Sequence, residues 1–251
     1  MQNKIKTYLA IFSFLFLFQD IISANANEKN HKSYTYKDSI AVSHILDSCW
    51  ANRTINPIFA LELGEEALAL IEEKEITMLK SKTLNFIGVV HRKLGNLQKS
   101  YEYFKYALNL AKALDDQEQI GYTYNNFSDY YFTKASYSLA LENVLIAYQI
   151  FDKLKHKSGM AYSLNYMGEI YIRHKEYDKA LKYLHEASNI RFEINDMRGY
   201  ANTMINIGQI YFLQDNYTEA MSQYTEALKI CKKIKYSKGI STIVSSLGDL
   251  N

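Results

Sequence analysis

The strongest constraint on the fold is a sequence repeat with a period of 40 residues. A small residue recurs at this spacing, in the series Gly88, Ser128, Gly168, Gly208 and Gly248. Parallel series of alanine or serine keep the same step, namely Ser100, Ala140, Ala180 and Ala220, and then Ala107, Ala147, Ala187 and Ala227. Self-similarity at a fixed period predicts stacked copies of one supersecondary unit.

Each unit has the pattern of two amphipathic helices joined by a tight turn. In one unit Leu164, Met167, Gly168 and Tyr171 follow the i, i+3, i+4, i+7 spacing of a single buried helical stripe. The turns contain pairs such as Gly95-Asn96 and Asp215-Asn216, which tolerate the left-handed conformation that ends a helix. One hairpin cannot bury its apolar faces alone, so neighbouring units must stack. The sequence therefore predicts an all-α protein.

The pattern Leu164-x-x-Met167-Gly168-x-x-Tyr171, followed by Tyr177, Ala180, Leu184 and Ala187, resembles the tetratricopeptide repeat. The resemblance implies a right-handed α-solenoid of antiparallel helix pairs. The unit is longer than the 34 residues usual in that family and lacks its closing proline. It is similar to the 40-residue, long-helix subtype of bacterial peptide-sensing regulators and cell-polarity scaffolds, which implies a bacterial exported tetratricopeptide protein.

The first residues have the layout of a secretory signal peptide. Lys4 and Lys6 precede an apolar run from Tyr8 to Phe18, and small residues follow at 24–26. A membrane-spanning helix needs about 20 apolar residues, which disfavours an uncleaved anchor. We expect cleavage after Ala26, export to the periplasm or another extracytoplasmic space, and no membrane span after the signal.

The repeat spacing also predicts the domain organisation. We expect a signal peptide at 1–26, a linker at 27–38 and a solenoid at 39–251, with a degenerate first unit at about 41–80. Full units are predicted at 81–120, 121–160, 161–200 and 201–240, followed by a truncated unit at 241–251. We expect Ile240, Ile243 and Leu247 to expose an apolar strip and to support self-association. The unfinished unit suggests a fragment, a truncated reading frame or an end that another subunit covers.

The composition and the motifs exclude several classes of function. Lys and Arg number 29 against 27 Asp and Glu, so the basic excess typical of nucleic-acid binding is missing. The sequence contains no phosphate-binding glycine loop, no Gly-x-Ser-x-Gly elbow and no His-Glu-x-x-His motif. The six histidines are scattered. We therefore expect no catalytic residues, no metal site, no cofactor and no enzyme activity.

The resemblance implies that the first helix of each unit lines a concave groove. The candidate groove residues are Lys82, Asn85, Arg92, Tyr122, Asn125, Asn126, Asp129, Tyr162, Asn165, Glu169, Arg173, Asn202, Asn206 and Gln209. An asparagine recurs shortly before the small site of each unit. Two interpretations stay open: the carboxamides pair with the backbone of a bound peptide, or they bond adjacent helices to one another.

These expectations favour an extracytoplasmic module that binds a protein or peptide ligand in its concave groove. The resemblance implies one setting, the sensory part of a bacterial signalling protein. The alternative is a structural scaffold that assembles an envelope protein complex through its convex face or its ends. Substitutions in the groove separate the two, because they abolish binding only in the first case.

Overall fold

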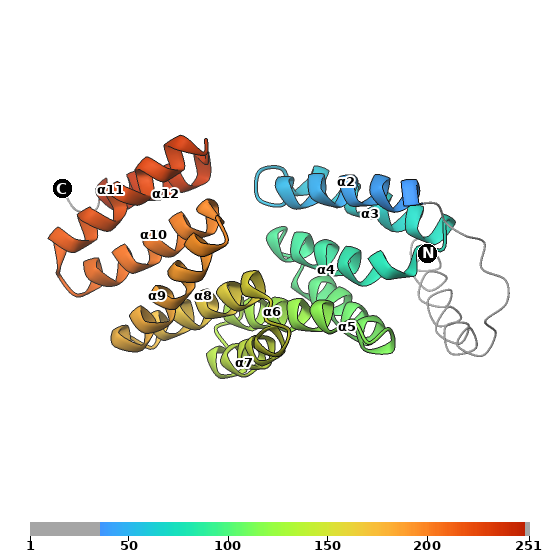
Figure 1. The fold of residues 1–251 in the computed structure, drawn as a ribbon, viewed down its shortest axis with the longest axis horizontal. Coiled ribbons are helices and arrows are strands. Elements are labelled where there is room, and N and C mark those ends of the chain that lie inside the picture. The colour runs from blue at the N-terminus through green and yellow to red at the C-terminus, as the bar shows by residue number, and fades with distance from the viewer. Residues whose placement is uncertain (1–35, 249–251) are drawn as a thin grey trace, which may run out of the picture.

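The computed structural model describes residues 36–248, which form an arc of antiparallel α-helices (Figure 1). The described helices are α2 (Tyr36–Asn52), α3 (Pro57–Glu73), α4 (Thr77–Lys93), α5 (Leu97–Ala113), α6 (Gln117–Thr133), α7 (Tyr137–Lys153), α8 (Lys157–Arg173), α9 (Tyr177–Glu193), α10 (Met197–Leu213), α11 (Tyr217–Lys233) and α12 (Ser237–Gly248). This architecture confirms the predicted all-α solenoid. The predicted signal peptide and most of the predicted linker lie outside the described residues.

One local device ends nearly every helix in the same way. The nine turns that follow α3 to α11 each place one residue at a positive φ, namely Glu75, Gly95, Asp115, Ala135, Lys155, Lys175, Asn195, Asp215 and Lys235. The next residue donates its N–H to a carbonyl five residues back, as Asn96 does to His91 at 2.9 Å. This bond satisfies a carbonyl that the helix end would leave free. The expectation of left-handed turns at Gly95 and Asp215 is confirmed.

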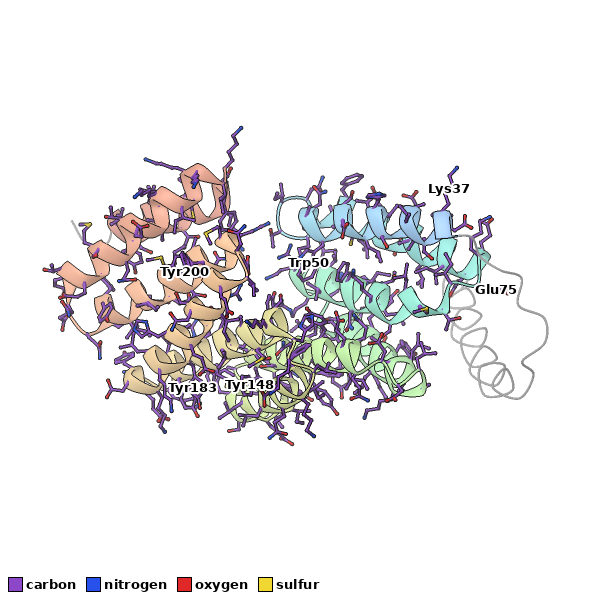
Figure 2. All side chains as sticks on the ribbon, in the orientation of Figure 1. Lys37, Trp50, Glu75, Tyr148, Tyr183 and Tyr200 are labelled. Carbon is purple, nitrogen blue, oxygen red and sulfur yellow. The ribbon has the colours of Figure 1, made fainter. Side chains whose placement is uncertain are left out.

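The helices form two layers. We call α2, α4, α6, α8, α10 and α12 the inner helices, and α3, α5, α7, α9 and α11 the outer helices. Each inner helix contacts the next inner helix, whereas the outer helices of the described chain make no comparable contacts with one another. The array therefore curves with the inner helices on its concave side (Figure 1). Tyr148 and Tyr183 mark the outer, convex side in Figure 2.

The small residues of the repeat allow the two layers to approach closely. A Cβ added to Gly88 would lie 2.5 Å from a ring carbon of Phe104, and one on Gly168 would lie 2.5 Å from Leu184 Cγ. Phe104 and Leu184 belong to the outer helix of the same unit and are fully buried. Gly208 meets Tyr224 in the same way. The small sites therefore face the outer helix of the same unit at these positions.

The helix bounds refine the units drawn from the sequence. The inner helices begin at residues 77, 117, 157, 197 and 237, which is four residues before the unit boundaries predicted at 81, 121, 161, 201 and 241. Helix α2 already begins at Tyr36, inside the segment predicted as a linker. The repeat pattern marks the buried stripe of a helix, and a helix begins before its first buried residue.

The prediction that the last helix exposes an apolar strip is wrong for Ile243, the central residue of that strip. Ile243 is 0% exposed, because it packs in a cluster with residues of α10 and α11. Ile240 and Leu247 are partly buried against the same cluster. Val244, which points away from it, is 58% exposed. One preceding helix pair is therefore enough to cover most of the apolar side of α12.

Three further features of residues 36–248 bear on function. Cys49 on α2 and Cys231 on α11 are both buried free thiols. Within the described segment, no helix has the length and hydropathy needed to cross a membrane. The same segment contains no group of three or more His, Cys, Asp or Glu side chains placed to hold a metal ion.

Candidate ligand-binding groove

A cavity of about 800 Å³ lies on the concave side of the arc and is bordered by all six inner helices. Most of the candidate residues line it, namely Lys82, Asn85, Tyr122, Asn125, Asn126, Asp129, Tyr162, Asn165, Glu169, Asn202 and Asn206. Arg92, Arg173 and Gln209 do not line it. The Arg173 guanidinium lies 5.6 Å from the Phe132 ring centroid, and Gln209 is exposed elsewhere. We call this cavity the groove.

Three of the asparagines bond neighbouring inner helices to one another. Asn85 Nδ2 donates to Thr123 Oγ1 at 2.9 Å. Asn125 Oδ1 accepts from Ser163 Oγ at 3.0 Å. Asn165 Oδ1 accepts from Thr203 Oγ1 at 3.1 Å, and each of these pairs is 38 residues apart. Of the two interpretations left open by the sequence, the geometry favours interhelical bonding at these positions.

The hydroxyl partners form a repeat series that the sequence analysis missed. Thr83, Thr123, Ser163 and Thr203 keep the 40-residue step and are all fully buried. Each can also donate to the carbonyl four residues back, as Thr123 does to Gln119 at 2.7 Å. A buried hydroxyl on an inner helix needs such partners. A Ser or Thr lies two residues before each of the three asparagines, and this recurrence could have predicted the series from the sequence.

The remaining amide groups are less fully satisfied. Asn126 Nδ2 donates to Asn85 Oδ1 at 3.1 Å. Asn125 Nδ2 is buried and has no partner among the described residues, although Asn125 borders the groove. Asn202 also borders the groove and makes no side-chain hydrogen bond within residues 36–248. Of these two residues, Asn202 is partly exposed and can contact a ligand directly, whereas Asn125 is buried.

Two carboxylates lie at the centre of the groove. Asp129 pairs with Arg92 and accepts from the Tyr166 hydroxyl at 2.9 Å. Glu169 Oε1 accepts from Asn165 Nδ2 at 2.6 Å and from Asn206 Nδ2 at 3.2 Å. Burial raises the pKa of Glu169 to about 7, and the negative charge of Asp129 adds to this shift. Glu169 therefore changes its protonation near neutral pH.

Five cationic side chains border the groove without an ion-pair partner among the described residues: the candidate Lys82, and in addition Arg53, Lys93, Arg198 and Lys238. The last four lie at helix ends, outside the stripes from which the candidates were chosen, so the sequence analysis missed them. The Arg53 guanidinium lies 3.7 Å from the Trp50 ring centroid, and that of Arg198 lies 4.4 Å from the Tyr236 ring centroid. Figure 2 shows Trp50 near the end of α2 that is turned toward the C-terminal helices.

The surroundings disfavour the positive charge of two of these side chains. Burial lowers the pKa of Lys93, and the nearby charges of Arg92, Lys238 and Arg53 lower it further, partly offset by Asp129. Burial also lowers the pKa of Arg53, with a further contribution from Arg198. Residues from the first and the last units of the array therefore act on one another across the groove.

Arg191 reaches the groove from an outer helix. It is 7% exposed, and its Nη1 lies 2.6 Å from Asp196 Oδ2. A Cβ on Gly199 would lie 1.6 Å from the same Nη1, so only glycine leaves room for this arginine. The equivalent outer-helix positions are apolar, namely Ile71, Ala111, Phe151 and Cys231. That break in the series was the signal that could have identified Arg191.

Comparisons with known proteins agree with this architecture. Models of the tetratricopeptide repeat match residues 159–233 and residues 81–114. The curated proteins include no match by sequence. Among solved structures, a thermophilic TPR protein of Thermus thermophilus superposes with a TM-score of 0.59 at 18% identity, covering 82% of this chain and 98% of that protein.

Two longer proteins share the fold over part of their length. Aspartyl phosphate phosphatase F of Bacillus subtilis superposes with a TM-score of 0.64 at 14% identity, covering 82% of this chain and 55% of that one. A Rap protein complexed with Competence and Sporulation Factor superposes with a TM-score of 0.61 at 13% identity, covering 86% of this chain and 64% of that one. Identities this low show a shared fold only. The matches at residues 81–114 and 159–233 identify tetratricopeptide repeats in this chain, and the stacked helix pairs agree with that family.

Proposed function

We propose that this protein binds a segment of a protein or peptide in its groove. The observation that carries the proposal is a cavity of about 800 Å³ whose border combines aromatic rings with amide groups that lack partners in the described chain. Repeat solenoids use extended concave surfaces of this kind for binding. The fold is that of a protein-interaction module, and a mixture of apolar walls and a few polar groups is typical of ligand sites.

The cellular setting is part of the same proposal. The signal-like layout of residues 1–26 supports export to an extracytoplasmic space. The structural similarity to a Rap protein complexed with Competence and Sporulation Factor supports a sensory role in a bacterial signalling protein. The alternative is a scaffold for an envelope complex, and exposed Val244 on the last helix favours an end-to-end contact in that case.

A peptide-display selection tests the binding proposal. Peptides selected on the purified protein are measured by calorimetry against the parent, Asn202→Ala, Asn202→Trp and Lys153→Ala. Asn202 lines the groove and bonds to nothing in the described chain, so its substitution should spare folding. Lys153 is an exposed residue at the end of outer helix α7 and serves as the matched control.

We expect Asn202→Trp to weaken binding by at least about tenfold, because the indole fills the groove, and Asn202→Ala to weaken it by a smaller factor of about three. Lys153→Ala should bind like the parent. Unchanged affinity in both Asn202 variants would contradict the proposal. Concentration-dependent self-association that is lost in Val244→Glu would instead favour the scaffold.

A further inference from the structure

Four of the five unpaired cations lie at helix ends near the two ends of the array, and the fifth, Lys82, lies within α4. Arg53 follows α2 and Lys93 ends α4, whereas Arg198 and Lys238 lie in the first turns of α10 and α12. All four border the same groove. No helix of the first unit contacts α10, α11 or α12 in the described chain. The groove is therefore where the two ends face one another, and both contribute positive charge to it.

Two other arginines already have a carboxylate partner: Arg191, which borders the groove, and Arg92, which does not line it. Arg92 pairs with Asp129, and Arg191 pairs with Asp196. Asp47, Glu118 and Glu169 also border the groove, but none of them lies within 4.0 Å of these four cations. Like charges gathered in a partly enclosed space repel one another. A ligand with several negative charges would relieve that repulsion.

The surroundings of the cations indicate the form of such a ligand. The Arg53 and Arg198 guanidinium groups lie against the Trp50 and Tyr236 rings, and Arg53 Nη1 also donates to the Trp50 carbonyl. The other N–H groups of the two arginines make no hydrogen bond within residues 36–248, so they can bind an anion. A volume of about 800 Å³ suits a peptide of a few residues better than a single small ion. Deeper in the groove, the buried Nδ2 of Asn125 lacks a partner in the described chain and can donate to a peptide carbonyl.

We infer that the groove binds an acidic peptide whose anionic side chains bridge Arg53 and Lys93 at one end of the array to Arg198 and Lys238 at the other. This inference rests on the proposed function and specifies its ligand. The required chemistry is a peptide anion, which either carboxylates or phosphates can supply. Because the two ends share no helix contact of their own in the described chain, the bound peptide holds them at a fixed separation.

Defined peptides test the charge requirement. The probes are fluorescein-labelled, C-terminally amidated tetraglutamate, the same peptide with two phosphoserines, and tetraglutamine. We expect at least one acidic probe to bind about tenfold or more tightly than tetraglutamine, and the tighter of the two identifies the anion. The double variant Arg198→Gln with Lys238→Gln should reduce that affinity at least about tenfold. Both residues are exposed, so the variant should fold like the parent.

Lys153→Gln, which removes an exposed charge outside the groove, is the matched control and should bind like the parent. Equal binding of tetraglutamate, phosphopeptide and tetraglutamine would overturn the acidic-peptide inference and leave the proposed function intact. A loss of affinity in Lys153→Gln as large as that in the double variant would also overturn the acidic-peptide inference and leave the proposed function intact. If neither these probes nor any display-selected peptide binds, both proposals fail.

Distance measurements test the bridge. Spin labels are attached to cysteines introduced at exposed Glu62 on α3 and Glu219 on α11. The native cysteines should not react at neutral pH, because both are buried and burial raises the pKa of Cys49 to about 11. We expect the acidic probe to narrow the distance distribution in the parent and not in Arg198→Gln with Lys238→Gln. An unchanged distribution in the saturated parent would overturn the bridge.

Discussion

The middle and the C-terminal end of the array solve the same packing problem with different residues. In the middle, Asn165 on α8 bonds to Thr203 on α10. One unit later the equivalent residues are Ile205 and Ile243, which belong to one apolar cluster. The pair is either polar on both sides or apolar on both sides. This exchange indicates that the asparagine position serves contact between inner helices, because a mixed pair would leave a buried polar group unsatisfied.

The middle and the ends of the groove also differ in whether their charged side chains have partners within the described chain. The middle of the groove contains internal pairs, such as Asp129 with Arg92 and Glu169 with two asparagines. The ends contribute Arg53, Arg198 and Lys238, which have no ion-pair partner in the described chain. We therefore assign stability chiefly to the middle of the groove and charge recognition to its ends.

The largest expected effect on stability comes from adding a methyl group at the small site, and it should differ between the middle of the array and its end. Gly168→Ala should destabilise the protein by about 3 kcal/mol, because the new Cβ would lie 2.5 Å from Leu184 Cγ. The equivalent Gly248 has open space around it, so Gly248→Ala should change stability by less than about 0.5 kcal/mol. Urea unfolding of both variants checks this contrast. Equal effects would show that the small site is not a packing constraint in the middle.

A double-mutant cycle tests the interhelical bonds. Asn125→Ala should cost about 2 kcal/mol, because it leaves the Ser163 hydroxyl without that partner. Ser163→Ala should cost a similar amount, and the two changes together should cost less than their sum by about 1 kcal/mol. Asn202→Ala, at a residue without side-chain bonds in the described chain, should be neutral. Strict additivity of the Asn125 and Ser163 effects would contradict a direct bond.

The carboxylate at the centre of the groove should make stability depend on pH. Because the folded state raises the pKa of Glu169 from 4.5 to about 7, the folded protein holds more protons than the unfolded chain between these values. Its stability should therefore fall as the pH rises from 4.5 to about 7, and then level off. Glu169→Gln should stabilise the protein by about 1–2 kcal/mol near pH ~8 and by nearly nothing near pH ~4. Thermal melts of the parent and Glu169→Gln across this pH range check the prediction. An equal gain in stability at both pH values would contradict the raised pKa of Glu169.

The smallest expected effect on stability concerns the positive-φ turns, and it should be the same in the middle of the array and at its end. Lys155 and Lys235 both adopt a positive φ, at which a Cβ is unfavourable and glycine is not. Lys155→Gly and Lys235→Gly should each stabilise the protein by up to about 1 kcal/mol, and Gly95→Ala should destabilise it by a similar amount. Differential scanning calorimetry can resolve these shifts. A gain at only one of the two lysines would show that the turns are not equivalent.

The sequence predicted the features that depend on periodicity within one unit. The 40-residue step located the paired helices, the small sites against Phe104 and Leu184, and the turns at Gly95 and Asp215. Together with the family resemblance, it also supplied candidate residues, most of which line the groove. The helices and turns follow from helical spacing and local backbone preference, which a single sequence displays directly.

Only the tertiary structure decided which polar groups meet across units. It assigned the amides of Asn85 and Asn125 to hydroxyls on the next inner helix, and it covered Ile243 with α10 and α11. It also brought Arg53 and Arg198 to one groove from positions far apart in the chain. The separation of such residues depends on the curvature that accumulates over successive helix contacts, and no pattern within a single unit specifies that sum.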